Sequence, residues 1–251
     1  MQFKPIASSS KGNCYIVESG GRRLVLELGI RWAEVRRALN FDSSKADAAL
    51  VSHSHSDHSK GVKDALKAGV DVWTSKETAM AIGIESHHRF NELSSGVKAS
   101  IGPWTVLPFD LHHDVPTHGF YIGAPDGESL AFIPDTSHIR NRFAGFNILA
   151  IECNNVEDVL SDNIVSGKVP VSLGHRVRRN HLSLERVVNM LKANDLSKCR
   201  EIWLLHLSDQ NSDEARMIRT VQEQTGIPCR AARYSEAGKR RSNSRRKGRY
   251  Q

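Results

Sequence analysis

The sequence predicts an α/β fold in which two sheets pack face to face beneath helices on both outer faces, a four-layer αββα sandwich. Two stretches of the chain are rich in strand-like segments, and segments of helical periodicity accompany each stretch. The 251 residues, 39% of them hydrophobic, can bury a sizeable core. No internal repeat or Pro/Gly/Ser-rich linker divides residues 1–237, which we expect to form one domain. Other α/β arrangements fit these segments as well, so the choice depends on motifs.

The first half of the chain begins with strands and then alternates strands with helices. Gly20 and Gly21 indicate a hairpin turn between two strands. Trp32, Val35 and Leu39 recur at helical spacing and predict a helix. The strands expected here are 2–7, 13–19, 22–28, 46–52 and 71–74, and the expected helices are 31–39, 60–68 and 76–82.

The second half returns to strands before it alternates again. Asp126 and Gly127 indicate another hairpin turn. Residues 173–180, which include His175 and Arg176, are expected to form a basic loop. The strands expected in this half are 97–101, 104–112, 118–123, 128–134, 147–152, 201–206 and 228–232, and the expected helices are 183–193 and 211–224.

Composition favours a cytoplasmic globular protein. No apolar run approaches the roughly 20 residues that a membrane helix needs, and residues 1–10 lack the basic start and apolar stretch of a secretory signal. The cysteines are scattered without a CxxC pair, which indicates reduced thiols: Cys14, Cys153, Cys199 and Cys229. We therefore expect a protein with no membrane partner that acts in the cytoplasm, whether it is bacterial or encoded by a phage.

Residues 238–251 form a basic tail with seven Lys or Arg and no Asp or Glu. Without these seven, the 35 basic residues fall to 28, which equals the 28 acidic residues of the chain. A segment of this composition cannot bury enough apolar surface to fold alone, so we expect it to be disordered. It would either hold the phosphate backbone of a nucleic acid or serve only as a solubilising terminus.

Six consecutive residues directly after an apolar strand carry the strongest chemical signal: His53, Ser54, His55, Ser56, Asp57 and His58. In an extended or turning loop, His53 and His55 project the same way, while Asp57 and His58 turn toward a neighbouring point. Imidazole and carboxylate suit Zn²⁺, Mn²⁺ or Fe²⁺, and two adjacent ligand pairs suit two ions about 3.5–4 Å apart. The plain alternative is a polar loop that is rich in histidine by chance.

This HxHxDH motif resembles the signature of the metallo-β-lactamase fold, a four-layer αββα sandwich with metal ions at one sheet edge. The resemblance implies three further ligands, for which the candidates are His113, Asp135 as a bridging carboxylate, and His206. His112 and His118 compete with His113, because neighbours on a strand face opposite ways. His113 is preferred because a His-Asp pair recurs in the subfamily named below.

Two divalent ions, Zn²⁺ or Mn²⁺, follow from this resemblance. The first ion would take His53, His55, His113 and Asp135, and the second would take Asp57, His58, Asp135 and His206. A water or hydroxide between the two ions would be the nucleophile, acidified by both cations. Asp57 and His181 are the candidate catalytic residues.

Four shorter motifs are similar to those of the YycJ/WalJ-like subfamily, and the likeness covers residues 3–232. They are Ser8 to Cys14 (SSSKGNC), Glu152-Cys153-Asn154 at a strand end, His181-Leu182-Ser183 before a helix, and His206-Leu207-Ser208 with Asn211. Cys153 departs from the usual serine, and the stretch 135–138 departs from the usual continuation, which leaves the role of His138 open. Hydroxyl, amide and guanidinium groups are candidates for binding substrate phosphates: Ser9, Ser10, Asn13, Asn154 and Arg176.

His181 lies 25 residues before His206, where related phosphodiesterases such as RNase Z carry a histidine that does not bind metal. The resemblance implies that His181 gives a proton to the leaving oxygen or holds the phosphate, and imidazole can do either near neutral pH. Otherwise it is only a neighbour of the start of the helix at 183–193.

The function expected is that of a dinuclear metal-dependent phosphodiesterase, specifically a YycJ-like DNA exonuclease. The main alternative is a phosphodiesterase for cyclic or other small nucleotides, in which a homodimer partner often completes the pocket. The missing export signal argues against a lactamase, and the missing helical substrate domain argues against glyoxalase II. A nucleic-acid-binding protein without catalysis is the third hypothesis, against which the complete ligand set argues.

Overall fold

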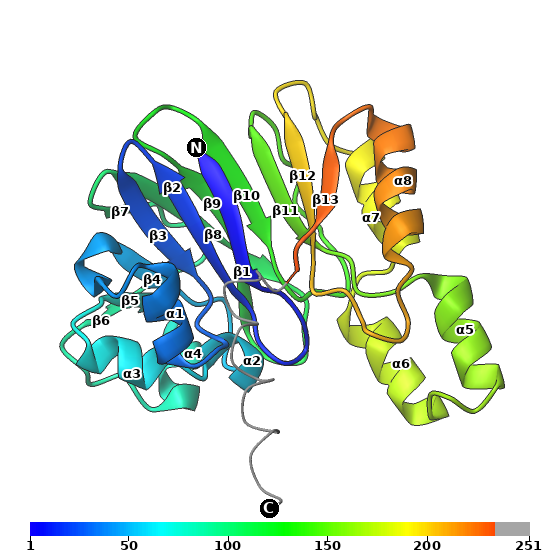
Figure 1. The fold of residues 1–251 in the computed structure, drawn as a ribbon, viewed down its shortest axis with the longest axis horizontal. Coiled ribbons are helices and arrows are strands. Elements are labelled where there is room, and N and C mark those ends of the chain that lie inside the picture. Colours follow the sequence, from blue (N-terminus) through cyan, green and yellow to red (C-terminus); the bar gives the residue numbers. More distant parts are fainter. Residues whose placement is uncertain (234–251) are drawn as a thin grey trace, which may run out of the picture.

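The computed structural model describes residues 1–233, in which two sheets pack face to face (Figure 1). Within this part of the chain the first sheet contains, in spatial order, β1 (Gln2–Ala7), β2 (Cys14–Ser19), β3 (Arg22–Leu26), β4 (Ala48–Leu50), β5 (Val72–Thr74) and β6 (Phe90–Glu92). The second contains β13 (Cys229–Ala231), β12 (Glu201–Leu205), β11 (Ile148–Glu152), β10 (Ser129–Ile133), β9 (Thr117–Gly123), β8 (Trp104–Leu111) and β7 (Ala99–Ile101). The predicted basic tail, 238–251, lies outside the described residues.

Both sheets change from antiparallel to parallel pairing, and this change positions the site. Strands β1 to β3 are antiparallel and β3 to β6 are parallel. In the second sheet β7 to β10 are antiparallel and β10 to β13 are parallel. The carboxyl ends of parallel strands meet at one edge, so residues that follow β10, β11 and β12 are brought together.

Helices lie outside both sheets (Figure 1). The first sheet is accompanied by α1 (Trp32–Ala38), the 3₁₀ turn Ser43–Lys45, α2 (Ser56–Ser59), α3 (Val62–Lys67) and α4 (Lys76–Ile82). The second is accompanied by α5 (Glu157–Val165), α6 (Val171–Asn180), α7 (Leu184–Lys192) and α8 (Glu214–Thr225). Figure 1 shows α7 and α8 beside the second sheet, with α5 and α6 extending beyond its end. No helix within residues 1–233 is both long and apolar enough to cross a membrane.

Three clusters of buried apolar side chains fill the spaces between the four layers. Tyr15, Trp104 and Phe120 belong to the cluster between the two sheets. A second cluster joins the first sheet to α1, α3 and α4, and a third joins the second sheet to α7 and α8. Burial of this kind contributes about 25 cal/mol for each Å² of apolar surface, so each layer needs its neighbour. The four-layer α/β prediction is confirmed.

Three local predictions differ from the structure. Residues 173–180, expected as a loop, form most of α6, and β6 and α5 were not expected. Helix α6 has few apolar residues, and it is stabilised by packing on α5 at Gly174, where a Cβ would lie 2.2 Å from Cδ1 of Ile164. The helix expected over 60–68 is observed as α3, and the short helix α2 precedes it, with Gly61 between them donating its N–H to the Leu28 carbonyl at 2.7 Å.

Candidate metal centre

Polar side chains from both sheets meet at the ends of the strands. His53 and His55 follow β4, and Asp57 and His58 lie in the short helix α2. The second sheet contributes residues that follow β8, β10 and β12, namely His113, Asp135 and His206. All seven residues expected to bind metal are therefore brought to one region, although they come from distant parts of the sequence.

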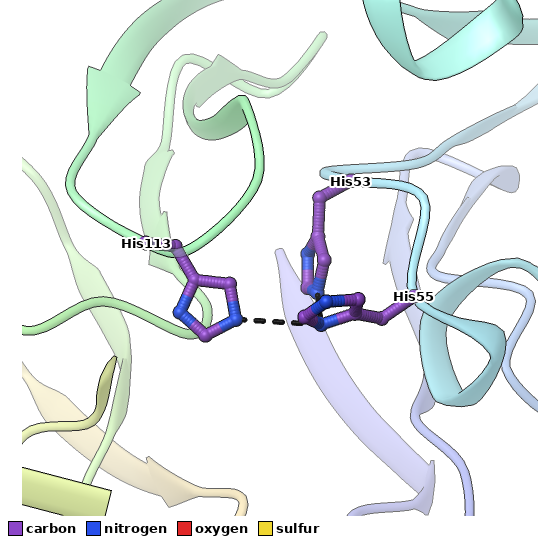
Figure 2. Close-up of side chains that lie close together, drawn as sticks. All are labelled: His53, His55 and His113. Carbon is purple, nitrogen blue, oxygen red and sulfur yellow. Dashed lines mark hydrogen bonds between the residues drawn. The ribbon is translucent and has the colours of Figure 1, made fainter. Parts of the chain in front are cut away.

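Three histidines form the first group (Figure 2). His55 Nδ1 lies 3.2 Å from His53 Nε2 and 3.4 Å from His113 Nε2. One nitrogen from each ring lies within 4.8 Å of the others, a spacing at which a single ion can be shared. Nitrogen ligands in this number suit Zn²⁺ or another divalent transition metal.

The other two candidates for the third-motif histidine point elsewhere. His112 Nδ1 lies 2.9 Å from Ser137 Oγ, and His118 Nε2 lies 3.5 Å from Asp110 Oδ1 in a different cavity. Of His112, His113 and His118, only His113 reaches the group formed by His53 and His55. The loop between β8 and β9 decides this, because it turns the His113 ring toward the cluster.

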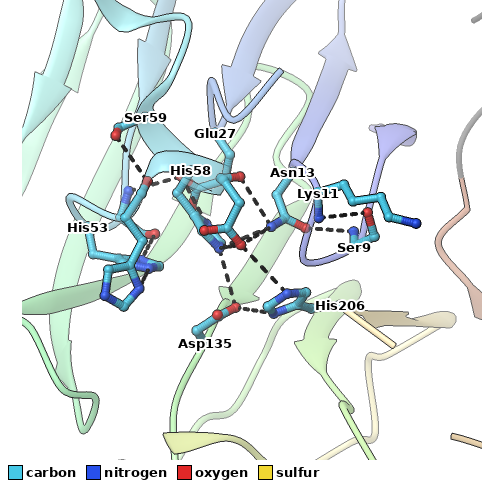
Figure 3. Close-up of polar contacts among 12 residues, drawn as sticks. Ser9, Lys11, Asn13, Glu27, His53, His58, Ser59, Asp135 and His206 are labelled. Atoms are coloured by element: carbon cyan, nitrogen blue, oxygen red, sulfur yellow. Dashed lines mark hydrogen bonds and ion pairs between the residues drawn. The ribbon is translucent and has the colours of Figure 1, made fainter. Parts of the chain in front are cut away.

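Asp135 is the centre of the second group (Figure 3). Its Oδ1 lies 2.7 Å from His206 Nδ1 and 3.5 Å from His58 Nε2. Asp57 Oδ2 lies 3.6 Å from His58 Nε2 and 3.7 Å from His206 Nε2. Asp135 also lies close to the first group, which contains His53. One possible ligand atom from each of His53, His58 and Asp135 lies within 4.8 Å of the other two.

The donor set fits divalent ions. His206 Nε2 is buried and has no hydrogen-bond partner among the described residues. It faces the Asp57 carboxylate, so a cation between the two would satisfy a nitrogen that burial otherwise leaves unsatisfied. Imidazole and carboxylate groups together are the ligands that hydrolytic Zn²⁺ and Mn²⁺ sites use.

Strong electrostatic coupling shifts several pKa values in this cluster. Burial alone would raise the pKa of Asp135, but His206 and His58 outweigh it and hold that pKa well below its usual range. Burial lowers the pKa of His206, yet Asp135 and Glu152 raise it to about 10. Burial and the neighbouring His58 lower the pKa of His53. The ion-free cluster therefore pairs a His206 cation with the Asp135 anion at neutral pH.

Glu152 was not among the residues expected at the site. Its fully buried carboxylate accepts hydrogen bonds from the backbone N–H groups of Thr136 at 2.9 Å and Leu182 at 3.2 Å. It also forms a short ion pair with His181 Nδ1. Burial lowers the pKa of His181, but the Glu152 and Asp135 carboxylates outweigh it and raise that pKa. The signal in the sequence that could have identified Glu152 is its position as a carboxylate at the end of an expected strand.

Glu27 and Ser8 also support the cluster, and the sequence did not single out either one for it. Glu27 is fully buried with a φ of 63°, and its Oε2 lies 3.5 Å from His58 Nδ1. Ser8 Oγ accepts a hydrogen bond from the His206 N–H at 2.9 Å. His206 has a φ of 54°, a conformation that costs about 1–2 kcal/mol for a residue with a Cβ. Fixed partners of this kind hold ligand rings in one orientation.

A cavity of about 360 Å³ opens beside the cluster. Among the predicted substrate-binding residues, Ser10, Asn154 and Arg176 line it, together with His181 and His206. Ser9, another of the predicted residues, precedes Ser10 in the sequence. Its backbone N–H donates a hydrogen bond to Asn13 Oδ1 at 3.2 Å.

Asn13, another residue expected to bind substrate, lies inside the protein. Its side chain is 0% exposed, and its Nδ2 lies 3.0 Å from His58 Nε2 and 3.4 Å from Asp57 Oδ2. The amide is used inside the protein, where it positions Asp57 and His58. In the sequence, Asn13 is a short polar residue next to Gly12, and this pattern does not distinguish a residue that binds substrate from one that positions its neighbours.

Fold and cluster together define a metal-dependent hydrolase. Residues 28–206 match the family described as the beta-lactamase superfamily domain, and the chain belongs to that superfamily. Exodeoxyribonuclease WalJ of Streptococcus pneumoniae is 26% identical over 227 residues, which cover 84% of this chain and 83% of that protein. Exodeoxyribonuclease YycJ of Bacillus anthracis is 27% identical over 245 residues, which cover 90% and 91%. The expected likeness to the YycJ/WalJ-like subfamily is confirmed.

Solved structures share the fold at low sequence identity. The metallo-beta-lactamase fold protein YhfI from Bacillus subtilis superposes with a TM-score of 0.72 at 15% identity, covering 93% of this chain and 97% of that one. The short form of human tRNase Z gives 0.64 at 11% identity, covering 94% and 98%. These likenesses support the architecture of the two sheets.

Proposed function

We propose that this chain is a DNA exonuclease that hydrolyses phosphodiester bonds with two divalent ions, Zn²⁺ or Mn²⁺. The observation that carries the proposal is the position of His181, which is held by Glu152 beside the Asp135 and His206 pair and lines the cavity at the cluster. Two relatives that are named exodeoxyribonucleases and align over most of both chains support DNA as the substrate.

The ligand atoms divide into two sets around Asp135. We assign His53, His55, His113 and Asp135 to one ion, and Asp57, His58, Asp135 and His206 to the other. When bound, two such ions would neutralise phosphate oxygens and lower the pKa of a water between them. The role of the chain is to hold the ligands in place, through Asn13 and Glu27 on His58 and through Ser8 on the backbone of His206.

His181 would serve the leaving oxygen. Its Nδ1 faces the buried Glu152 carboxylate, which only accepts hydrogen bonds when ionised, so Nδ1 carries a hydrogen. The other ring nitrogen, Nε2, is the atom available to substrate in the cavity. A proton held there can pass to the departing sugar oxygen, and general acids of this kind contribute about 10²–10⁴ in rate.

Arg176 would bind a phosphate next to the scissile one. Its side chain is 67% exposed and lines the cavity, and Asp114 Oδ2 lies 3.7 Å from Arg176 Nη2. This distance exceeds a hydrogen bond, so the donors of Arg176 remain available to a phosphate. The basic tail, 238–251, would add a grip on the backbone that does not depend on sequence.

A phosphodiesterase for small nucleotides is the second candidate. The cavity of about 360 Å³ favours it, since it lies at the small end of the roughly 300–1,000 Å³ of ligand pockets. A homodimer partner that closes the cavity would belong to this alternative, and the tail would then have no part in binding.

One preparation should be given two kinds of substrate, in Mn²⁺ and in Zn²⁺. The first is end-labelled linear DNA, single- and double-stranded, and the second is a panel of cyclic nucleotides. Asp135→Asn serves as the blank. A variant with the seven basic residues of the tail replaced by glutamine is compared with the unchanged chain, so that length is preserved.

Progressive loss of DNA from one end, slowed in the glutamine variant, is the expected result. Ring opening of a cyclic nucleotide while DNA stays intact would overturn the exonuclease proposal in favour of the second candidate. Full turnover by Asp135→Asn would contradict the assignment of Asp135 to both ions.

A further inference from the structure

A second cavity of about 310 Å³ lies between the segment 138–142 and α7. Its rim carries His138, Arg140, Arg142 and Arg186. No Asp or Glu is present among the described residues that line it. The three guanidinium groups repel one another, and an anion in the cavity would relieve that repulsion.

The arginines keep their charge available. Arg186 Nη1 donates to the carbonyls of Ser137 and Arg178, each at 3.0 Å, which fixes the guanidinium and leaves other N–H groups for a ligand. Arg142 is likewise anchored on a backbone carbonyl, that of Ala193. Within residues 1–233, no carboxylate forms an ion pair with Arg140, Arg142 or Arg186.

The field at His138 is positive. Burial, followed by the charges of His112, Arg140 and Arg186, lowers the pKa of this imidazole. The same groups would therefore attract a phosphate.

The floor of the cavity has a different character from its rim. Leu182 and Met190 are buried and apolar, and Ile139 lies beside them. Asn189 adds an amide with both donor and acceptor atoms. Asn141 and Asn194 also line the cavity. Apolar side chains beside amides suit a nucleobase, whereas the arginines suit the attached phosphate.

The segments that line this cavity continue directly from the metal cluster along the chain. His138 comes three residues after Asp135, and Leu182 directly follows His181. Ser137 Oγ, next to His138, contacts His112, the neighbour of His113. This continuity is the basis for placing in the cavity a nucleotide next to one whose phosphodiester lies at the cluster.

We propose that the cavity between 138–142 and α7 binds a nucleotide that flanks the scissile bond, with its phosphate on Arg140 and Arg186 and its base on Leu182. The proposal rests on the exonuclease function and deepens it, because it names a subsite for the DNA strand. Arg140 is the residue to test, since Arg186 also holds the backbone.

Binding is measured on the metal-loaded protein by fluorescence anisotropy, with a labelled single-stranded oligonucleotide whose phosphorothioate linkages resist hydrolysis. Arg140→Gln should weaken binding about 5- to 10-fold and lower the slope of log K against log salt by about one. Arg140→Lys should recover part of the affinity. Arg36→Gln, on α1 at the outer face of the first sheet, removes the same charge and should change affinity less than about twofold.

Activity on bis(p-nitrophenyl) phosphate, a diester too small to reach the cavity, should be equal in the wild type and in Arg140→Gln. Equal oligonucleotide affinity of Arg140→Gln and Arg36→Gln would overturn the subsite while leaving the exonuclease proposal intact. If wild type does not cleave DNA, the exonuclease function fails and the assignment to a scissile bond fails with it, whereas weaker oligonucleotide binding by Arg140→Gln alone would still support a nucleotide-binding site in this cavity.

Discussion

His113 Nδ1 lies 3.0 Å from the backbone carbonyl oxygen of Asn180, the residue before His181. A carbonyl only accepts hydrogen bonds, so Nδ1 must be the protonated nitrogen of His113. Nε2 is then unprotonated and faces His55 and His53 with its lone pair. One hydrogen bond thus orients a histidine ring of the cluster and joins it to the segment that carries His181.

Substitution of His113 should remove metal, whereas substitution of its neighbour should not. His113→Ala deletes a nitrogen from the group of three, and we expect it to lose at least one ion per chain and most activity. His112→Ala is the matched control, because His112 faces Ser137 and not the cluster. Metal content by mass spectrometry of the purified proteins measures the difference. Equal metal loss in both variants would contradict the orientation given to His113.

Glu152→Gln should impair the chemical step more than binding. Without the negative charge the pKa of His181 falls, because the Glu152 carboxylate is what raises it against burial. The protonated form of His181 then disappears at a lower pH, so the alkaline limb of the pH–rate profile should shift to lower pH. We expect kcat to fall by at least about tenfold with KM changed much less. An unchanged profile would show that Glu152 serves only to hold the backbone of Thr136 and Leu182.

Metal binding should release protons. In the ion-free chain the pKa of His206 is raised to about 10, and that of His58 is also raised because Asp135 and Glu27 outweigh burial. A histidine binds metal only when neutral, so ions must displace these protons at neutral pH. Affinity should therefore fall as pH decreases, with about two protons released per chain at pH 7. Titration calorimetry in buffers of different ionisation enthalpy measures this number, and heats that do not depend on buffer would refute it.

Gly29→Ala should disturb the short helix α2, which carries Asp57. A Cβ at Gly29 would lie 1.6 Å from the Asp57 carbonyl oxygen, so the backbone must move. We expect a loss of about 3 kcal/mol in the free energy of unfolding together with weaker metal binding. Gly69→Ala is the comparison, because its Cβ meets nothing within 4 Å although φ is +86°. That variant should lose only about 1 kcal/mol and keep its metal. Chemical denaturation monitored by circular dichroism gives both values.

The sequence predicted the strands and the first half of the site because those signals are local. Alternating apolar residues and glycine turns mark strand ends, and the six residues 53–58 keep their ligands together by spacing alone. The candidates His113, Asp135 and His206 could be named because the resemblance to the metallo-β-lactamase fold implies three further ligands and each of these residues lies at the end of an expected strand.

Tertiary structure alone decided which side chains meet. Glu152 and Glu27 are separated by more than a hundred residues, yet both act on histidines of one cluster. Asn13 was expected to bind substrate, and packing buries it against His58. Helix α6 has few apolar residues of its own and forms because Gly174 lets it approach α5. The physical reason is the same in each case, since burial and charge partners depend on segments that only the folded chain brings together.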